Sequence, residues 1–177
     1  MQLIARKLVL SVVLISSVFA QSAISAESAA PAFSPSDSGP TPETTMVGFF
    51  RWYSSGPFMH RSDPYGVNPP PPFGLEEELG QIPTTNVAGS HPLYNCFHTP
   101  RGHQDYFTSL DIDCEGFVHA QPYAYGEPSA FVMTTHVTGT VPLYRCLLQG
   151  IYHYDSLQSN CEVAGAVTEG VLGYIYQ

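Results

Sequence analysis

The sequence predicts an all-β domain built from three internal copies of one small unit. After the first 26 residues, no stretch keeps an apolar period of 3.6 residues for more than two turns, which disfavours helices. Aromatic-rich runs that alternate in character are instead separated by Gly, Pro, Asn and Asp, the residues typical of turns. The copies are visible because the segment 48–62 aligns with 142–156 without a gap.

The copies are expected to span residues 46–90, 91–138 and 139–177. The middle copy begins at His91, where HPLYNC matches VPLYRC of the third copy. Repeats of this size cannot bury their own apolar faces, so they must pack on one another. We therefore expect a β-trefoil-like threefold barrel with about four strands in each copy, and a small β-sandwich or a blade-like repeat array as alternatives.

Each copy contains recognisable strands in the same order. The first is Val141–Cys146 in the third copy, and aromatic-rich runs follow at Tyr106–Leu110 and Tyr152–Leu157. A last strand is expected over Leu172–Tyr176. The alignment also matches Ser109 with Ser156, Cys114 with Cys161, Gly126 with Gly173, and residues 76–82 with residues 169–175.

The first 26 residues have the pattern of a signal peptide. A short basic region ends at Lys7 and is followed by an apolar run of about 13 residues. Cleavage is expected after Ala20 or Ala26, because small residues precede both positions. The pattern predicts export to the periplasm or the medium, and an uncleaved anchor helix is the alternative.

Residues 27–45 are rich in Pro, Ser, Thr and Ala and contain almost no large apolar side chains. Such a segment cannot offset the entropy of ordering, so we expect a flexible linker. The remaining residues, 46–177, are expected to form a single domain.

The four cysteines suit two disulfides in an exported chain. Three connectivities are open, and we favour Cys96–Cys114 and Cys146–Cys161 because each pair lies inside one copy. A zinc site is disfavoured, since no pair has the C-x-x-C spacing. The first copy has no cysteine: Trp52 stands where Cys146 stands and Val67 where Cys161 stands, so Trp52 is expected to pack on Val67.

The exported chain is strongly acidic. Two of the six basic residues, Arg6 and Lys7, lie in the expected signal peptide, whereas all fifteen acidic residues follow it. Such a surface repels phosphate groups, so we expect no nucleic-acid partner and no membrane binding after cleavage. The aligned Arg51 and Arg145 are expected to pair structurally with residues 76–78 and with Glu169.

The third copy resembles a bacterial secreted tandem repeat family of unknown function, whose usual form is PLYRC, G-x-DHF-x-S, CEG and then EG-x-LGY. The matching residues are 142–146, 152–154, 161–162 and 169–174, and the resemblance extends over 46–177. The family's Asp-His-Phe is replaced by residues 104–107 in the second copy and by residues 151–154 in the third. The family is often appended to secreted peptidases and other hydrolases, which implies an accessory role without established catalytic residues.

Asp111, Asp113 and Glu115 alternate along the sequence DIDCE. On a strand they would share one face, so they could bind Ca²⁺ with Asp105 as a fourth ligand. The alternative is a solvated acidic edge that protects a strand against aggregation.

His98, His103 and Asp105 lie in one short segment and are a looser candidate for a transition-metal site, with an ordinary surface loop as the alternative. No nucleophile motif of the G-x-S-x-G or H-E-x-x-H kind is present, and the cysteines are expected to be oxidised. We therefore expect a protein that is not an enzyme and, a calcium ion apart, has no cofactor.

Tyrosines give the main indication of function. The chain has eleven, and Tyr combines a flat apolar face with a hydroxyl group, which suits sugar rings and protein surfaces. We expect a monomeric, exported binding module for carbohydrate or cell-envelope glycan. The alternative is a protein-interaction partner, such as an inhibitor or accessory subunit of a secreted hydrolase. The candidate ligand-binding residues are Tyr106, Tyr123, Tyr125 and Tyr152.

Overall fold

The structure is a computed structural model in which the following residues are described: 44–56, 58–64, 67, 69, 71–117 and 127–177. The expected signal peptide, 1–26, lies outside them, and so does the expected linker, 27–45, except for its last two residues. Tyr123 and Tyr125 also lie outside the described residues.

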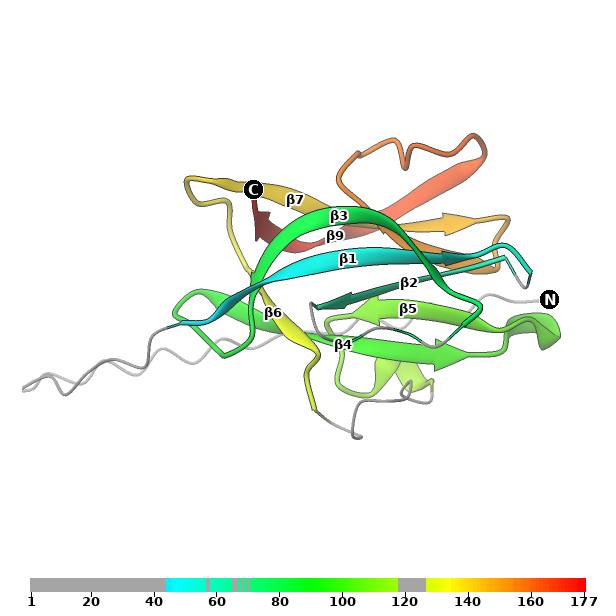
Figure 1. Cartoon of the computed structure of the whole chain (residues 1–177), viewed down its shortest axis with the longest axis horizontal. Helices are drawn as coiled ribbons and strands as arrows, with labels where there is room; N and C mark the ends of the chain where they lie inside the picture. The colour runs from blue at the N-terminus through cyan, green and yellow to red at the C-terminus, as the bar shows by residue number, and fades with distance from the viewer. Residues whose placement is uncertain (1–43, 57, 65–66, 68, 70, 118–126) are drawn as a thin grey trace, which may run out of the picture. The chain divides into compact units, whose positions relative to one another are not determined.

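The described part of the chain is all-β, as the sequence predicts (Figure 1). It contains two single-turn 3₁₀ helices, η1 (Pro100–Gly102) and η2 (Cys114–Gly116). The strands are β1 (Met46–Ser54), β2 (Met59–Pro64), β3 (Gly74–Pro83), β4 (Ser90–His98), β5 (Asp105–Ser109), β6 (Ala130–Met133), β7 (Thr140–Leu148), β8 (Tyr152–Ser156) and β9 (Ala166–Tyr176). None of the described helices is long and apolar enough to cross a membrane.

One scheme of strand pairing occurs three times. β1 pairs with β2 and β3, β4 with β5 and β6, and β7 with β8 and β9, always antiparallel. Each expected copy thus holds three described strands rather than about four. The registers agree: Phe49 lies opposite Gly80, and Leu143 opposite Gly173. In the second copy Leu93 lies opposite Ala130, so Ala130 and not Gly126 corresponds to Gly173.

The hydrogen-bonded sheet is open, so the expectation of a closed barrel is wrong. Its strand order is β2-β1-β3-β9-β6-β4-β5, and β7 and β8 continue from β9 on a branch. β9 joins the other copies through one residue pair each, Gln81 with Tyr176 and Met133 with Tyr174. β2, β5 and β8 each have a single paired strand, and they meet one another through side chains instead of backbone hydrogen bonds.

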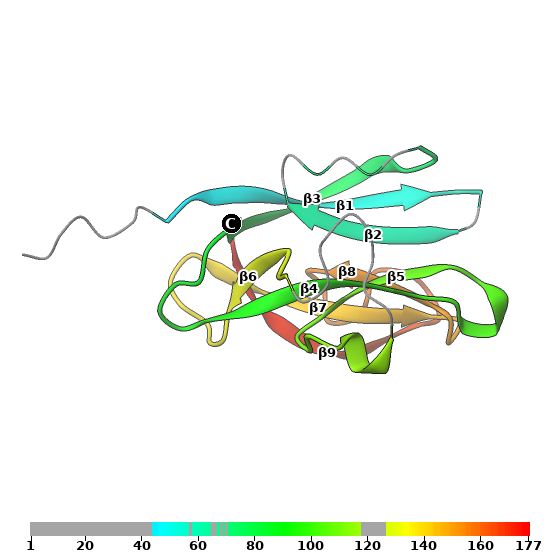
Figure 2. The same cartoon turned by 90° about the horizontal axis from the view of Figure 1, so that it is seen from below.

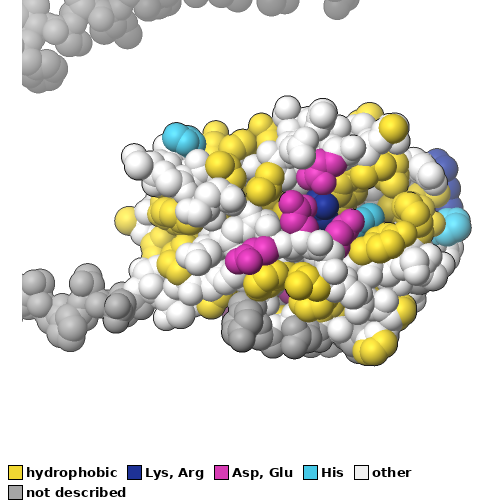
Figure 3. Space-filling model, turned by 45° about the horizontal axis from the view of Figure 1, so that its top comes forward, with side chains coloured by type: hydrophobic (Ala, Val, Ile, Leu, Met, Phe, Trp, Pro, Cys, Tyr) yellow, Lys and Arg dark blue, Asp and Glu magenta, His cyan; other side chains and the backbone are white. Residues whose placement is uncertain are grey.

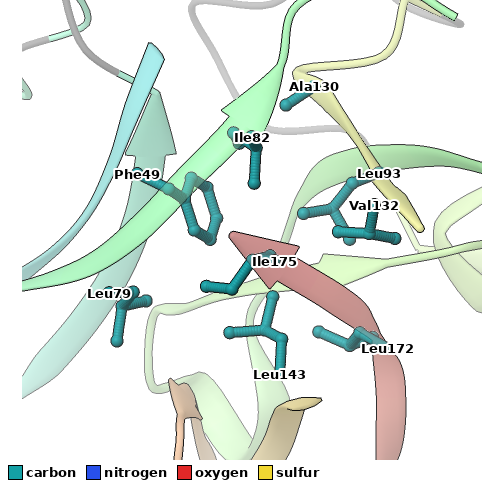
Figure 4. Close-up of a cluster of buried hydrophobic side chains, with 9 residues drawn as sticks. All are labelled: Phe49, Leu79, Ile82, Leu93, Ala130, Val132, Leu143, Leu172 and Ile175. Atoms are coloured by element: carbon teal, nitrogen blue, oxygen red, sulfur yellow. The ribbon is translucent and has the colours of Figure 1, made fainter. Parts of the chain in front are cut away.

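All three copies contribute to one apolar core (Figure 4). Phe49, Leu93 and Leu143 come from the first strands of the copies and are fully buried. The third strands add Leu79, Ile82, Ala130, Val132, Leu172 and Ile175. Burying one large aliphatic or aromatic side chain contributes about 1.5–3 kcal/mol, and no copy could build this cluster alone.

Two glycines allow the copies to approach closely. Gly80 has a φ of 144°, and a Cβ there would lie 2.4 Å from the carbonyl oxygen of Tyr176. A Cβ at Gly173 would lie 2.5 Å from Val132 of the second copy. Both glycines therefore sit where the third strand of one copy passes another copy, which explains why the alignment retains them.

The expected disulfides are both present. Cys96 is bonded to Cys114 and Cys146 to Cys161, at sequence separations of 18 and 15, and each bond closes within one copy. Loops of this size contribute about 3 kcal/mol each through the unfolded state. Two disulfides are compatible with an extracellular protein. Trp52 and Val67 are both half-buried, and a contact between them stays a prediction.

Candidate functional site

The second strands of the copies form a buried polar interior. β2, β5 and β8 contact one another (Figure 2). Every residue of β2 and β8 is buried. A buried polar group that lacks a partner costs free energy, so these strands must satisfy one another. The buried polar side chains of the three strands are His60, Arg61, Ser62, Asp63, Asp105, Thr108, Ser109, His153, Asp155 and Ser156.

Three side chains, one from each copy, form a hydrogen-bonded group around the carboxylate of Asp155. Ser62, Thr108 and Asp155 occupy the same position in the three registers. The hydroxyl of Thr108 donates to the Asp155 carboxylate at 2.6 Å, and Ser62 also forms a hydrogen bond with it. Burial of this carboxylate raises the pKa of Asp155 above its ordinary value.

Arg51 of β1 connects the first copy to the third. Its guanidinium lies 2.8 Å from Glu76, 2.8 Å from Glu77 and 3.1 Å from Glu162, and it donates to the carbonyl oxygen of Asp155 at 2.7 Å. Only 5% of Arg51 is exposed. The expected pairing with residues 76–78 is confirmed, and the guanidinium also links two copies.

Arg145 of β7 makes the corresponding connection from the third copy to the second. It lies 2.7 Å from Glu169 and 2.5 Å from Glu115, and it donates to the carbonyl oxygen of Thr108 at 3.2 Å. The hydrogen bond from Arg145 holds the pKa of Glu115 below its ordinary value. Figure 3 shows one face of the molecule on which several acidic side chains surround a basic side chain.

The second copy has Asn95 at the position of these arginines. Its side-chain amide donates to Asp63 of the first copy at 2.7 Å. Polar contacts thus run from the first copy to the third, from the third to the second, and from the second to the first.

Two histidines and an aspartate converge beside this interior. The Oδ2 atom of Asp105 lies 2.7 Å from Nε2 of His98 on β4 and 2.5 Å from Nδ1 of His153 on β8. The Oδ1 atom accepts the backbone N–H of His153 at 2.8 Å. Asp105 is only 1% exposed, so both of its oxygens depend on protein partners.

Carboxylates face both ring nitrogens of His153. Nδ1 contacts Asp105, and Nε2 lies 3.2 Å from Oε2 of Glu169. Burial alone would lower the pKa of His153, but the hydrogen bonds and charges of Asp105 and Glu169 raise it to about 9. Without a bound cation, His153 is therefore an imidazolium at neutral pH and balances part of the charge of both carboxylates.

A pocket of about 410 Å³ adjoins the His98 side of the cluster. The His98 ring packs against Phe117 at an interplanar angle of 57°, with the ring centroids 4.1 Å apart. The disulfide between Cys96 and Cys114 holds both walls, because Phe97 follows Cys96 directly and η2 begins at Cys114. Among the described residues, the lining is formed by Phe97, His98, Thr99, Pro100, Gly116 and Phe117.

The structure does not bring the expected calcium ligands together. β5 ends at Ser109, and residues 111–115 form a turn and η2 instead of the expected strand. The carboxylate of Asp111 accepts the backbone N–H groups of Asp113 and Glu115, at 3.1 and 3.0 Å, because the turn leaves these donors without strand partners. Glu115 faces Arg145, and Asp105 belongs to the histidine cluster.

The two described tyrosine candidates are largely packed. Tyr106 is half-buried, and the guanidinium of Arg61 lies 5.5 Å from its ring centroid. Tyr152 is 8% exposed, and its hydroxyl lies 3.1 Å from Nδ1 of His103. Tyr152 therefore offers little free ring surface to a ligand.

Sequence reasoning found His98 and Asp105 but missed His153. It grouped His103 with them, whereas His103 contacts the Tyr152 hydroxyl. A signal was present: Asp105 and Tyr152 share a register position, and so do Tyr106 and His153. Asp105 and His153 therefore stand at neighbouring register positions of two different copies, and their side chains meet across those copies.

Comparisons with known proteins assign neither a family nor a function to the chain. The chain matches no model of a protein family, and neither a search of curated proteins nor a search of solved structures finds a match. The function is therefore inferred from the contacts, charges and pockets of the chain itself.

Proposed function

We propose that this protein is an exported, non-enzymatic binding module that takes carbohydrate or cell-envelope glycan in the pocket between Phe97 and Phe117. The supporting observation is the pocket itself, an open aromatic hollow of about 410 Å³ whose two walls are joined by one disulfide. When the walls of a pocket are already fixed, binding a ligand costs little conformational entropy.

The lining chemistry suits a sugar ring. Phe117 is 43% exposed and presents an apolar ring on which the C–H groups of a sugar can pack. His98 and Thr99 add polar groups beside that ring, as hydroxyl-rich ligands require. The resemblance to a secreted repeat family with accessory roles agrees with this proposal.

We infer further that the three copies are related as a trefoil-like threefold repeat, with an open sheet instead of a barrel. The recurring registers support this arrangement, and so do the polar contacts of Arg51, Arg145 and Asn95, each of which reaches another copy. The residues that line the aromatic pocket belong to the second copy.

The proposal is tested by retention on insoluble polysaccharides, including peptidoglycan. Phe117→Ala should weaken retention about fivefold to tenfold, because packing on an aromatic side chain contributes of order 1 kcal/mol. Phe58→Ala is the matched control, since Phe58 is 40% exposed and does not line the pocket. Failure of the unaltered protein to bind any glycan, or full retention by Phe117→Ala, would contradict the proposal.

A protein partner is the second candidate, supported by apolar side chains exposed on or beside β9. Val163, Val167 and Val171 are 42%, 58% and 46% exposed. Such residues are candidates for contact with a secreted peptidase or other hydrolase. Co-purification with one such enzyme that Val167→Glu abolishes would favour this function, and co-purification unchanged by that variant would count against it.

A further inference from the structure

We propose that His98, Asp105 and His153 bind one divalent transition-metal ion. Their ligand atoms, Nε2, Oδ2 and Nδ1, all lie within 4.8 Å of one another. They come from β4, β5 and β8, so strands of two copies would hold the ion between them. No other group of three such side chains is found in the described part of the chain.

The spacing needs little change to admit an ion. Zinc lies about 2.0–2.2 Å from nitrogen and oxygen ligands, which places tetrahedral ligand atoms about 3.3 Å apart. The two contacts of Asp105 Oδ2 are 2.7 and 2.5 Å, so each would lengthen by less than about 1 Å. Side-chain rotation can supply such a movement without a change of backbone.

The surrounding residues already orient the ligands. Histidines that bind metals commonly donate their other ring N–H to a carboxylate, and Nε2 of His153 lies 3.2 Å from Glu169. Arg145 holds Glu169 in turn at 2.7 Å. The second oxygen of Asp105 is occupied by the His153 backbone N–H, which leaves Oδ2 for the ion.

Two imidazoles and one carboxylate suit Zn²⁺ and its neighbours in the first transition series better than Ca²⁺. Binding at Nδ1 of His153 and at Nε2 of His98 displaces the protons that these atoms share with Asp105. The His153 proton passes to the solvent, and the His98 proton passes to the solvent or to Nδ1 of the same ring. Three protein ligands leave at least one coordination position for water or another ligand. His98 lines the aromatic pocket, so this position is expected on the side from which small molecules can enter.

The inference does not depend on glycan binding, because the ion alone is the probe. The untagged chain, with its disulfides intact, is treated with EDTA, desalted and titrated with Co²⁺ by visible absorption and with Zn²⁺ by calorimetry. We expect one ion per chain. Absence of stoichiometric binding to the unaltered chain overturns the inference.

Variants assign the ligands. His98→Gln and Asp105→Asn should each bind Zn²⁺ at least about tenfold more weakly, and Glu169→Gln about 10–100-fold more weakly because it removes the partner of His153. His91→Gln is the matched control on the same strand, since His91 is exposed and lies far along β4 from His98. His103→Gln should also bind normally, because His103 contacts Tyr152 instead.

Folding of each variant is checked by circular dichroism. Because His98 lies at the end of β4, His98→Gln is expected to fold even where Asp105→Asn does not, and its result then decides. Unchanged affinity in a folded His98→Gln variant, or a loss of affinity as large in His91→Gln, overturns the assignment of the site.

Discussion

The carboxylate of Asp105 accepts hydrogen bonds from two histidines and a backbone N–H while it is 1% exposed. Such a group is stabilised only by partners from other elements, because water cannot reach it. Its removal leaves the buried imidazolium of His153 without one of its two carboxylates.

Asp105→Ala should therefore lower the free energy of unfolding by about 3–5 kcal/mol, the usual cost of breaking a buried ion pair. Urea denaturation of the metal-free protein measures it. The exposed Glu127→Gln is the control and should change the stability by less than about 0.5 kcal/mol. A similar small loss for Asp105→Ala would mean that the cluster contributes little to the fold.

His153 predicts how stability changes with pH. Its pKa in the folded protein is about 9, above the ordinary 6.5, so its stabilising contribution is complete below about pH 6.5 and is lost as the pH rises through about 9. Asp105 of β5, Glu169 of β9 and His98 of β4 are the titratable groups that face it.

With EDTA present, the free energy of unfolding should fall by on the order of 2 kcal/mol between pH 6.5 and pH 9, and His153→Gln should remove most of this slope. Urea titrations at several pH values provide the measurement. An equal slope in the variant would show that other groups cause the change.

The strands could be predicted from the sequence where the apolar pattern and the internal alignment indicate the same segment. The expected strands in the third copy correspond to β7, β8 and β9, and both disulfides join the expected residues. The segment 111–115 was not predictable in the same way, because alternation of acids indicates a strand only where backbone partners exist. Asp111 bonds the backbone locally and forms a turn instead.

The first strands of two copies carry arginines whose contacts differ in burial. The Arg51 side chain is 6% exposed and has three carboxylates within 3.1 Å, whereas the Arg145 side chain is 15% exposed and has two, Glu115 and Glu169, within 2.7 Å. Solvent screens the ion pairs of the more exposed arginine more strongly, so they contribute less.

Arg51→Met should thus destabilise the protein by about 3 kcal/mol, because it leaves Glu76, Glu77 and Glu162 close together without their cation. Arg145→Met should cost less, about 1–2 kcal/mol. Urea denaturation of both variants under the same conditions gives the order. The reverse order would show that burial does not govern these links between copies.

In the whole molecule, the strands of the three expected copies pair in the same way, but their assembly into an open sheet could not be predicted from the sequence. Gly80 lies opposite the buried Phe49 and Gly173 opposite the buried Leu143, because the shared core requires this register. The histidine cluster was hidden because Asp105 and His153 are 48 positions apart and belong to different copies. A closed barrel was expected because closure removes edges, whereas here side-chain contacts bury the edge strands β2, β5 and β8.

The strand sets β1–β3, β4–β6 and β7–β9 share one interior, so we expect them to fold as a unit. Native-state hydrogen exchange of the backbone amides in β1, β4 and β7 tests this expectation. The slowest amides of all three strands should exchange with the same free energy, equal to that of global unfolding measured with urea. Exchange from one of these strands at a clearly lower free energy would show a copy that opens by itself and would contradict the claim.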